Sequence, residues 1–345
     1  MKKLHKLLFT LCILCFIHLS ATAQNSNAAN DLIKQGVDLH NQGKYADAID
    51  KFNEVLKTDP ENPYANYEIA FSLYASKKPN DAIPHIEKAV KSNNPSLNVA
   101  AYCLLASIYD ESNQSVKAIE TYNQAIKINP DYPQIYYNLG IAYFRNKQYA
   151  EAESSAVEAI KHNPKNVSSQ RLYALVTFHQ NKRVNALMGF CSLILLEPTG
   201  PHAAEAYANI QHIMQGGVLK DANGATTLNV SSNDDKETGT LNMGISLAAI
   251  SGQSKKLTGM DLLEYELKTI FGMTGELSEK KTDKTFFDKF FVAYFYKLSQ
   301  SNYMPVFTHT LTLTDTKLDN ATWAKQNMEQ INGMADWLKN TGRSF

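Results

Sequence analysis

Cysteine is scarce in this chain, and this limits the kind of exported protein it can be. Two of the four cysteines, Cys12 and Cys15, lie within the first 23 residues, and the other two are Cys103 and Cys191. Their wide separation favours two small buried apolar side chains over a disulfide. So few cysteines exclude a disulfide-rich secreted domain and fit a bacterial envelope protein better.

The sequence also lacks the motifs that usually mark catalysis or cofactor binding. It has no H-E-x-x-H, no G-x-S-x-G, no glycine-rich phosphate-binding loop and, beyond the first 23 residues, no C-x-x-C. The polar run 231–239 resembles a calcium-binding loop only faintly, because the central glycine and the closing glutamate are missing. The sequence therefore predicts no catalytic residue, no cofactor and no metal site.

The N-terminus carries the pattern of an export signal. Lysines precede a short apolar run from Leu7 to Leu19, and Ala21-Thr22-Ala23 forms an A-x-A cleavage site. The apolar run is too short to span a bilayer, although an uncleaved membrane anchor is the alternative interpretation. We expect a signal peptide over residues 1–23, a short linker over 24–28, and export to the periplasm or beyond in a Gram-negative bacterium.

An excess of basic charge is also lacking. Cleavage after residue 23 would remove three lysines and no acid, so the 34 basic side chains would fall to 31 against 34 acidic ones. The resulting net charge of −3 argues against nucleic acid or an anionic membrane surface as the main partner. No transmembrane segment is expected after cleavage.

What the sequence does contain is a repeat of about 34 residues. Its clearest copy, residues 136–164, reads as two short amphipathic helices joined by a tight turn. An alanine recurs in the second helix at spacings of 34, 36, 34 and 34 residues, at Ala48, Ala82, Ala118, Ala152 and Ala186. A proline closes four copies, at Pro60, Pro130, Pro164 and Pro198, and Pro95 follows the second copy one residue late. A unit of this size cannot bury its apolar face alone, so the copies must stack.

These positions resemble the tetratricopeptide repeat family, whose unit carries W-x2-L-G-x2-Y, then A-x3-F, then P. The match is degenerate: the fourth copy keeps Leu139 and Gly140 but has Ala156 where an aromatic residue is usual. The resemblance implies a mainly α fold, a right-handed solenoid of five helical hairpins over residues 29–200. A single helix over 201–215 would cap it.

The resemblance also implies that the first helices of successive repeats line a concave face. Carried over position by position, it predicts a groove for a protein or peptide partner, formed by Tyr67, Phe71, Tyr74, Tyr137, Ile141, Phe144, Arg171 and Phe178. Aromatic side chains offer much area with few torsions to fix, which suits an extended or helical peptide. Packing of these side chains against the fold is the alternative, and the chain's own C-terminal segment is a possible occupant.

The C-terminal third resembles no family. Residues 216–257 are predicted to form a β-hairpin or a linker, because Asn223-Gly224 is a strong turn and the stretches 226–231 and 240–250 read as strands. Residues 258–345 are predicted to form a smaller domain, mostly helical in an α+β fold. Its stretch 304–313 is ambiguous between helix and strand.

The sequence as a whole predicts a non-catalytic protein-interaction scaffold of the cell envelope. Two alternatives stay open. The aromatic and acidic side chains between Asp261 and Asp288 could belong to a ligand-binding or enzymatic domain that the repeats dock. The chain could also be a structural subunit of an envelope assembly.

Overall fold

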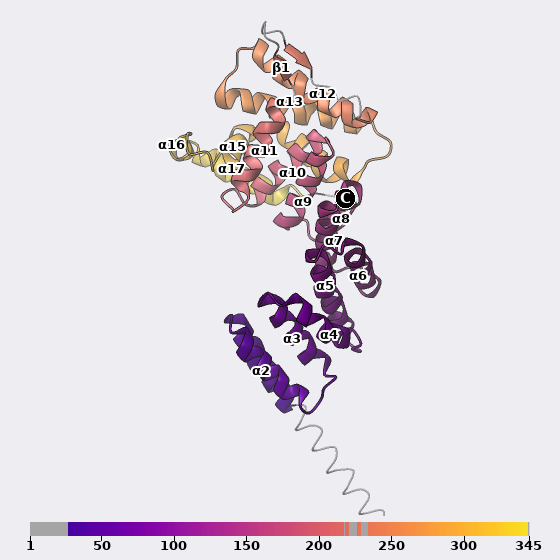
Figure 1. The fold of residues 1–345 in the computed structure, drawn as a ribbon. Coiled ribbons are helices and arrows are strands. Elements are labelled where there is room, and N and C mark those ends of the chain that lie inside the picture. The colour runs from indigo at the N-terminus through magenta and orange to yellow at the C-terminus, as the bar shows by residue number, and fades with distance from the viewer. Residues whose placement is uncertain (1–26, 217, 221–225, 229–233, 344) are drawn as a thin grey trace, which may run out of the picture. The chain divides into compact units, whose positions relative to one another are not determined.

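A computed structural model describes residues 27–216, 218–220, 226–228, 234–343 and 345 of the chain. They form two compact units, Met1–Ile135 and Tyr136–Phe345, within which the fold is mainly helical (Figure 1). The signal peptide predicted for residues 1–23 lies outside the described residues. Within the described ranges, none of the helices combines the length and apolar character needed to cross a membrane.

The first unit is a succession of helical hairpins. It begins with a helix over residues 27–41. The helices that follow are α2 (Tyr45–Leu56), α3 (Pro63–Ala75), α4 (Pro79–Ala89), α5 (Pro95–Glu111), α6 (Ser115–Ile128) and the first residues of α7 (Pro133–Arg145). Helices consecutive in the chain pack on one another, as α3 does on α2 and α4.

One backbone feature recurs with the same period as the alanines. The turn inside each hairpin holds a residue with a φ angle between 58° and 75°, namely Gly43, Lys77, Asn113, Lys147 and Asn181. Glycine and asparagine adopt this left-handed conformation readily, whereas the two lysines need the hydrogen bonds of a tight turn to hold them there. All five repeated alanines are fully buried. The five predicted hairpins are therefore confirmed.

Asparagine side chains begin several of the first helices. The amide oxygen of Asn62 accepts a hydrogen bond from the backbone N–H of Ala65, and Asn94 and Asn166 cap α5 and α9 in the same way. Each cap satisfies a backbone donor that the helix itself leaves without an acceptor. These caps fix where the first helix of a repeat starts, and so which of its side chains face the solvent.

The second unit continues the hairpins and then adds the C-terminal helices. Its elements after α7 are α8 (Tyr149–His162), α9 (Val167–His179), α10 (Arg183–Leu196), α11 (Ala203–Gln215), β1 (Val218–Lys220), β2 (Thr226–Leu228), α12 (Lys236–Ser254), α13 (Gly259–Glu279), η1 (Asp288–Val292), α14 (Ala293–Ser299), α15 (Met304–Leu311), α16 (Asn320–Gln326) and α17 (Met328–Asn340). β1 and β2 pair antiparallel, with Val218 opposite Leu228. The predicted hairpin is confirmed.

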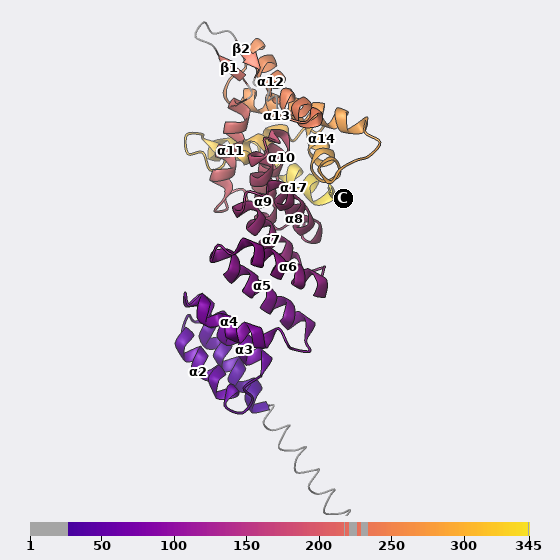
Figure 2. The ribbon, with the colours of Figure 1, turned by 45° about the vertical axis from the view of Figure 1, so that its right-hand side comes forward.

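Helix α10 forms the centre of this unit (Figure 2). Eleven of its 14 residues are buried, and it contacts α9, α11, α12, α15 and η1. Gly189 permits the close approach of α9, since a Cβ atom there would lie 2.9 Å from the Cβ of Ala174. A helix that is apolar on all sides has to be covered on all sides. The last repeat and the C-terminal helices consequently share one hydrophobic core.

That shared core changes the predicted domain boundaries. We expected residues 216–257 to separate the repeats from a distinct C-terminal domain, but the two compact units divide within α7, after Ile135. The helix expected to cap the repeats is α11, and it contacts both α10 and α12. The cap therefore joins the repeats to the C-terminal helices.

The prediction of β-structure or linker is wrong for the second half of residues 216–257. There the chain forms α12, whose N-terminus is capped by Asp235 through the N–H and hydroxyl of Thr238, at 2.9 and 2.7 Å. Leu241, Ile245 and Ala248 recur at helical spacing and are buried. The glycines in this stretch lower helix propensity, but packing against α10 and α13 overrides that preference.

Two smaller details of the C-terminal helices complete the fold. The ambiguous stretch 304–313 is helical, as α15. The last helical stretch is divided into α16 and α17 at Asn327, which has a φ of −120° and a ψ of 26°.

Candidate functional site

The predicted groove residues of the first unit lie along α3 and form part of a row of stacked rings. The ring of Phe71 lies 4.7 Å from that of His40 and 6.2 Å from that of Tyr67, with interplanar angles of 17° and 10°. We call these three side chains the stacked row. Phe71 is 38% exposed although it lies between two other rings. The row therefore presents an apolar edge to solvent.

The two outer rings of the stacked row are uncharged near neutral pH. Burial lowers the pKa of His40, whose Nδ1 lies 2.8 Å from the hydroxyl of Ser72. Burial, with a further contribution from Glu68, raises the pKa of Tyr67 to about 12. The row is consequently a neutral surface, suited to an apolar side chain of a partner.

Tyr74 is oriented by a contact to the next repeat. Its hydroxyl donates a hydrogen bond to Glu111 Oε1 at 2.5 Å, which ties α3 to the end of α5. His40 occupies the same position in the first repeat that Tyr74 occupies in the second, 34 residues later. The repeat spacing could therefore have identified His40, which the sequence prediction missed.

The other predicted groove residues lie in the second unit and are half-buried. Tyr137, Ile141, Phe144 and Phe178 all pack against the core of that unit. Phe144 and Phe178 meet through the exposed ring of His179, at 5.1 and 6.2 Å. These side chains therefore pack on the fold and keep part of their surface exposed, and their role in partner binding stays a prediction.

Arg171, predicted to contact a partner, has an internal partner. Its Nε and Nη2 atoms donate to the carboxylate of Glu205 at 3.0 and 2.8 Å, which joins α9 to α11. The fork geometry of the guanidinium matches a carboxylate in this arrangement. A ligand carboxylate would have to compete with Glu205 for the Arg171 guanidinium.

The C-terminal segment packs against other helices of the second unit. The guanidinium of Arg343 contacts Ser192 of α10 and the ring of Tyr294, and Phe345 lies 6.0 Å from the ring of Phe290. These contacts are with α10, η1 and α14 rather than with the predicted groove residues. In the structure, Arg343 and Phe345 therefore do not occupy the predicted groove.

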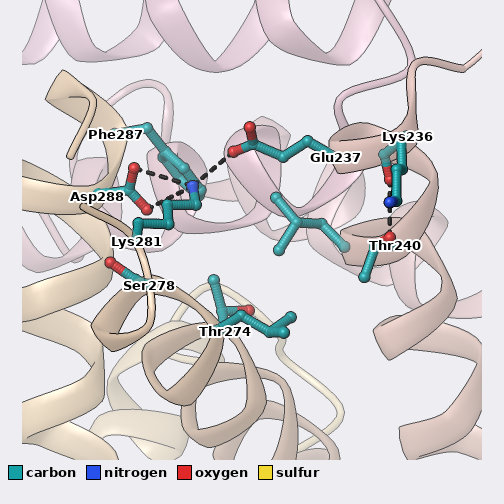
Figure 3. Close-up of a pocket in the computed structure, with 10 residues that line it drawn as sticks. Lys236, Glu237, Thr240, Thr274, Ser278, Lys281, Phe287 and Asp288 are labelled. Atoms are coloured by element: carbon teal, nitrogen blue, oxygen red, sulfur yellow. Dashed lines mark hydrogen bonds and ion pairs between the residues drawn. The ribbon is translucent and has the colours of Figure 1, made fainter. Parts of the chain in front are cut away.

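A cavity of about 340 Å³ lies among α12, α13 and the start of η1 (Figure 3). Lys281 crosses one side of it and contacts Asp288 Oδ1 and Oδ2, both at 2.9 Å, and Glu237 Oε1 at 2.6 Å. Asp288 is only 2% exposed. Its burial alone would raise its pKa, but hydrogen bonds from Lys281 and Thr285 hold the pKa below its usual value. Asp288 is therefore ionised and paired.

The chemistry of this cavity is that of a neutral, mainly apolar site. Figure 3 shows Lys281 between the two carboxylates, so neither Glu237 nor Asp288 is free to act as a base. Leu241 and Phe287 supply apolar walls, and the lining also contains the hydroxyl groups of Thr and Ser side chains. The arrangement can bind an uncharged molecule, but its lining offers no free general base.

Nucleophilic and metal chemistry find little support in the described residues. Cys103 and Cys191 are free and buried. Burial raises the pKa of the Cys103 thiol to about 12 and raises that of Cys191 as well, so both stay protonated at neutral pH. Over the ranges that the structure describes, no group of three or more His, Cys, Asp or Glu side chains is placed to hold a metal ion.

Comparison with known proteins finds similar repeats over part of the chain. Models described as TPR repeat or tetratricopeptide repeat match residues 39–101, 106–147 and 133–166. Tetratricopeptide repeat protein 6 of Homo sapiens is 28% identical over 138 residues, which is 39% of this chain and 25% of that protein. TPR repeat-containing protein YpiA of Bacillus subtilis is 30% identical over 127 residues, 36% of this chain and 29% of that protein. The chain thus spans less than a third of the length of either relative.

A solved structure of MamA is 25% identical to this chain, with a TM-score of 0.43, and covers 47% of this chain and 94% of its own. Tetratricopeptide repeats generally serve as scaffolds for protein–protein interaction, and the repeat itself is typically non-catalytic. The buried alanines, the recurring turns and the family matches agree over residues 39–166. Residues 39–166 therefore carry tetratricopeptide repeats.

Proposed function

We propose that this chain is an exported, non-catalytic scaffold of the Gram-negative cell envelope that holds a protein or peptide partner on the aromatic faces of its repeats. The observation that carries the proposal is the stacked row of His40, Phe71 and Tyr67. Its central ring is 38% exposed, yet it is already held in place by its neighbours. A partner would bury that ring at little cost in side-chain entropy.

The chemistry of the row indicates the kind of partner. Its rings are neutral, and the hydroxyl of Tyr74, further along α3, is engaged with Glu111. A peptide segment with at least one large apolar side chain would fit this surface better than a highly charged one. In the second unit, Phe144 and His179 offer a separate aromatic contact of the same character.

The absence of catalysis is part of the proposal. Both described thiols are buried, and the carboxylates beside the cavity of Figure 3 are paired with Lys281. These observations favour binding over chemistry at the surfaces described above. The alternative of a ligand-binding C-terminal region is supported by the cavity itself.

Capture of partners from an envelope extract tests the binding surface. We expect wild-type protein to retain a partner that Phe71→Ala loses. The matched control is Val116→Ala, which removes an exposed apolar side chain from a second helix of the same unit. Phe144→Ala tests the aromatic contact of the second unit by itself. Equal recovery of every partner by wild type, Phe71→Ala and Phe144→Ala would exclude the aromatic faces as the binding surface.

Export of the protein needs a separate test, because partner capture would give the same result whether or not the protein is exported. Mass spectrometry of the protein recovered from periplasm should give a chain that begins at Gln24, after the A-x-A site. Deletion of residues 2–23 should leave the protein in the cytoplasm. A full-length chain in the membrane fraction would support the uncleaved anchor instead.

A further inference from the structure

A second cavity in the Tyr136–Phe345 unit has a different electrostatic character. It has a volume of about 600 Å³ and lies among α11, α12, α13 and the loop that follows α15. Met214, Leu262 and Leu263 give it an apolar wall, and Gln211 and Gln253 add amide groups. The volume is in the range of small-molecule sites in proteins.

The charged side chains that line this cavity are both acidic. Glu266 comes from α13 and Asp315 from the loop after α15, and among the described residues no lysine, arginine or histidine belongs to the lining. In the cavity of Figure 3, by contrast, lysine and carboxylate side chains neutralise each other. The larger cavity therefore favours a cation and disfavours a phosphate or carboxylate ligand.

Glu266 is the more buried of the two acids in the lining. It is only 9% exposed, and its carboxylate makes no hydrogen bond or ion pair with the part of the chain that the structure describes. Gly252 lets α12 lie close over it: a Cβ atom at that position would come within 2.5 Å of Leu262 Cδ1 and 3.8 Å of Glu266 Cγ. The side chain is thus held by packing rather than by a polar partner.

A buried carboxyl group without a polar partner lowers the stability of the folded protein when it is ionised. Burial raises the pKa of Glu266 to about 7, because desolvation disfavours its charged form. A glutamine or a leucine would fill the same space without that cost. Unpaired buried acids that line a cavity are therefore candidates for ligand contact.

We propose that the cavity binds a small organic ammonium ion, with the ammonium group on Glu266 and the apolar chain against Met214, Leu262 and Leu263. A bare metal ion fits less well, since within the described ranges no cluster of three metal-ligating side chains occurs here or elsewhere. An ammonium group needs only hydrogen-bond acceptors, which Glu266, Asp315 and the glutamine amides can supply.

Isothermal titration of the mature chain with hexylammonium chloride at pH 8 tests this proposal. Hexan-1-ol and sodium hexanoate serve as neutral and anionic probes of the same length. We expect saturable binding of hexylammonium at one site. Glu266→Gln should weaken this binding about tenfold or more, because it removes one hydrogen bond to a charged group. The matched control Glu276→Gln, an exposed position on the same helix, should bind as wild type does.

The pH dependence of binding gives a second readout. Among the described residues, the titratable side chains in the lining are Glu266 on α13, Asp315 in the loop and Tyr207 on α11, while α12 contributes none. Burial raises the pKa of Tyr207, so its phenol stays neutral. With a Glu266 pKa of about 7, affinity should fall about tenfold from pH 8 to pH 6 in wild type, and not in Glu266→Gln.

Two results would overturn the proposal. One is equal affinity of wild type and Glu266→Gln for hexylammonium, which would place the cation elsewhere. The other is equal affinity for hexylammonium and hexan-1-ol, which would show an apolar cavity that ignores charge. Thermal melting of each variant at both pH values confirms that the compared proteins are folded.

Discussion

Arg343 Nη1 donates a hydrogen bond to the hydroxyl oxygen of Ser192 at 2.6 Å, across 151 positions of the sequence. Ser192 lies fully buried on α10 and itself donates to the amide oxygen of Gln170 on α9. The Arg343 guanidinium also lies 4.1 Å from the ring centroid of Tyr294. Burial lowers the pKa of Arg343 to about 10, and Tyr294 opposes that effect. Arg343 therefore ties the last residues of the chain to α10 and α14 of the second unit.

Arg343→Ala should lower the free energy of unfolding by about 2–4 kcal/mol, because it removes a charge-assisted hydrogen bond and a desolvated cation–π contact. Arg343→Lys should recover only part of the loss, since an ammonium group cannot stack on the rings as a planar guanidinium does. Chemical denaturation of the mature chain measures both. Lys339→Ala is the control, because that side chain is 75% exposed, and it should change stability by less than about 0.5 kcal/mol. Equal stability of wild type and Arg343→Ala would contradict the assigned role.

Lys281→Met should lower the free energy of unfolding by about 2–4 kcal/mol, because it leaves the buried carboxylate of Asp288 without its cation. Glu237→Gln should cost less than about 1 kcal/mol, since the Glu237 side chain is 53% exposed. The folded-state pKa of Asp288 is lowered, so its contribution is present above the ordinary aspartate value and is lost as the pH falls through the folded value. The gap between wild type and Lys281→Met should accordingly narrow in strong acid. A gap that stays constant down to pH 2 would contradict this assignment.

The repeats could be predicted because each copy is fixed by local constraints. A small residue such as Ala152 is needed where two helices touch, and a turn residue such as Asn181 is needed where φ is positive. Both requirements recur every 34 residues or so and can be read from the sequence. The same spacing predicted Phe71 and Tyr67 as groove residues. It did not lead to His40, although His40 lies at the equivalent position of the first repeat.

The second unit was predicted less well because non-local packing determines it. The run from Val184 to Leu196 is apolar on nearly all sides, whereas the outer helix of an exposed repeat needs only one apolar face. The extra apolar residues of this run could have indicated that other helices cover α10. The contact of Lys281 with Glu237 joins residues 44 positions apart, and no periodicity in the sequence relates them. The cavities likewise depend on how α11, α12 and α13 pack.

Glu266→Gln should raise the free energy of unfolding at pH 8 by about 3 kcal/mol and leave it nearly unchanged at pH 4.5. The folded-state pKa of Glu266, about 7, exceeds the value of 4.5 expected for an unfolded glutamate. The folded protein therefore holds more protons between these values, and wild-type stability falls as the pH rises through that window. Chemical denaturation without ligand at both pH values measures the difference. Glu276→Gln should show no such change between the two pH values, and a Glu266→Gln variant less stable than wild type at pH 8 would contradict the prediction.

Ile69→Ala and Phe71→Ala should separate the structural from the binding residues of α3. Ile69 is 1% exposed and packs in the hydrophobic core of the first unit, so its truncation should cost about 2–4 kcal/mol of stability. Phe71 is 38% exposed and contacts mainly His40 and Tyr67, so its truncation should cost about 1 kcal/mol, the value of an aromatic pair. Denaturation curves of the two variants measure these losses, and partner capture at a temperature where both are folded should then be lost by Phe71→Ala alone. If Phe71→Ala proved as destabilising as Ile69→Ala, the stacked row would be part of the core, and its exposure would no longer argue for a partner.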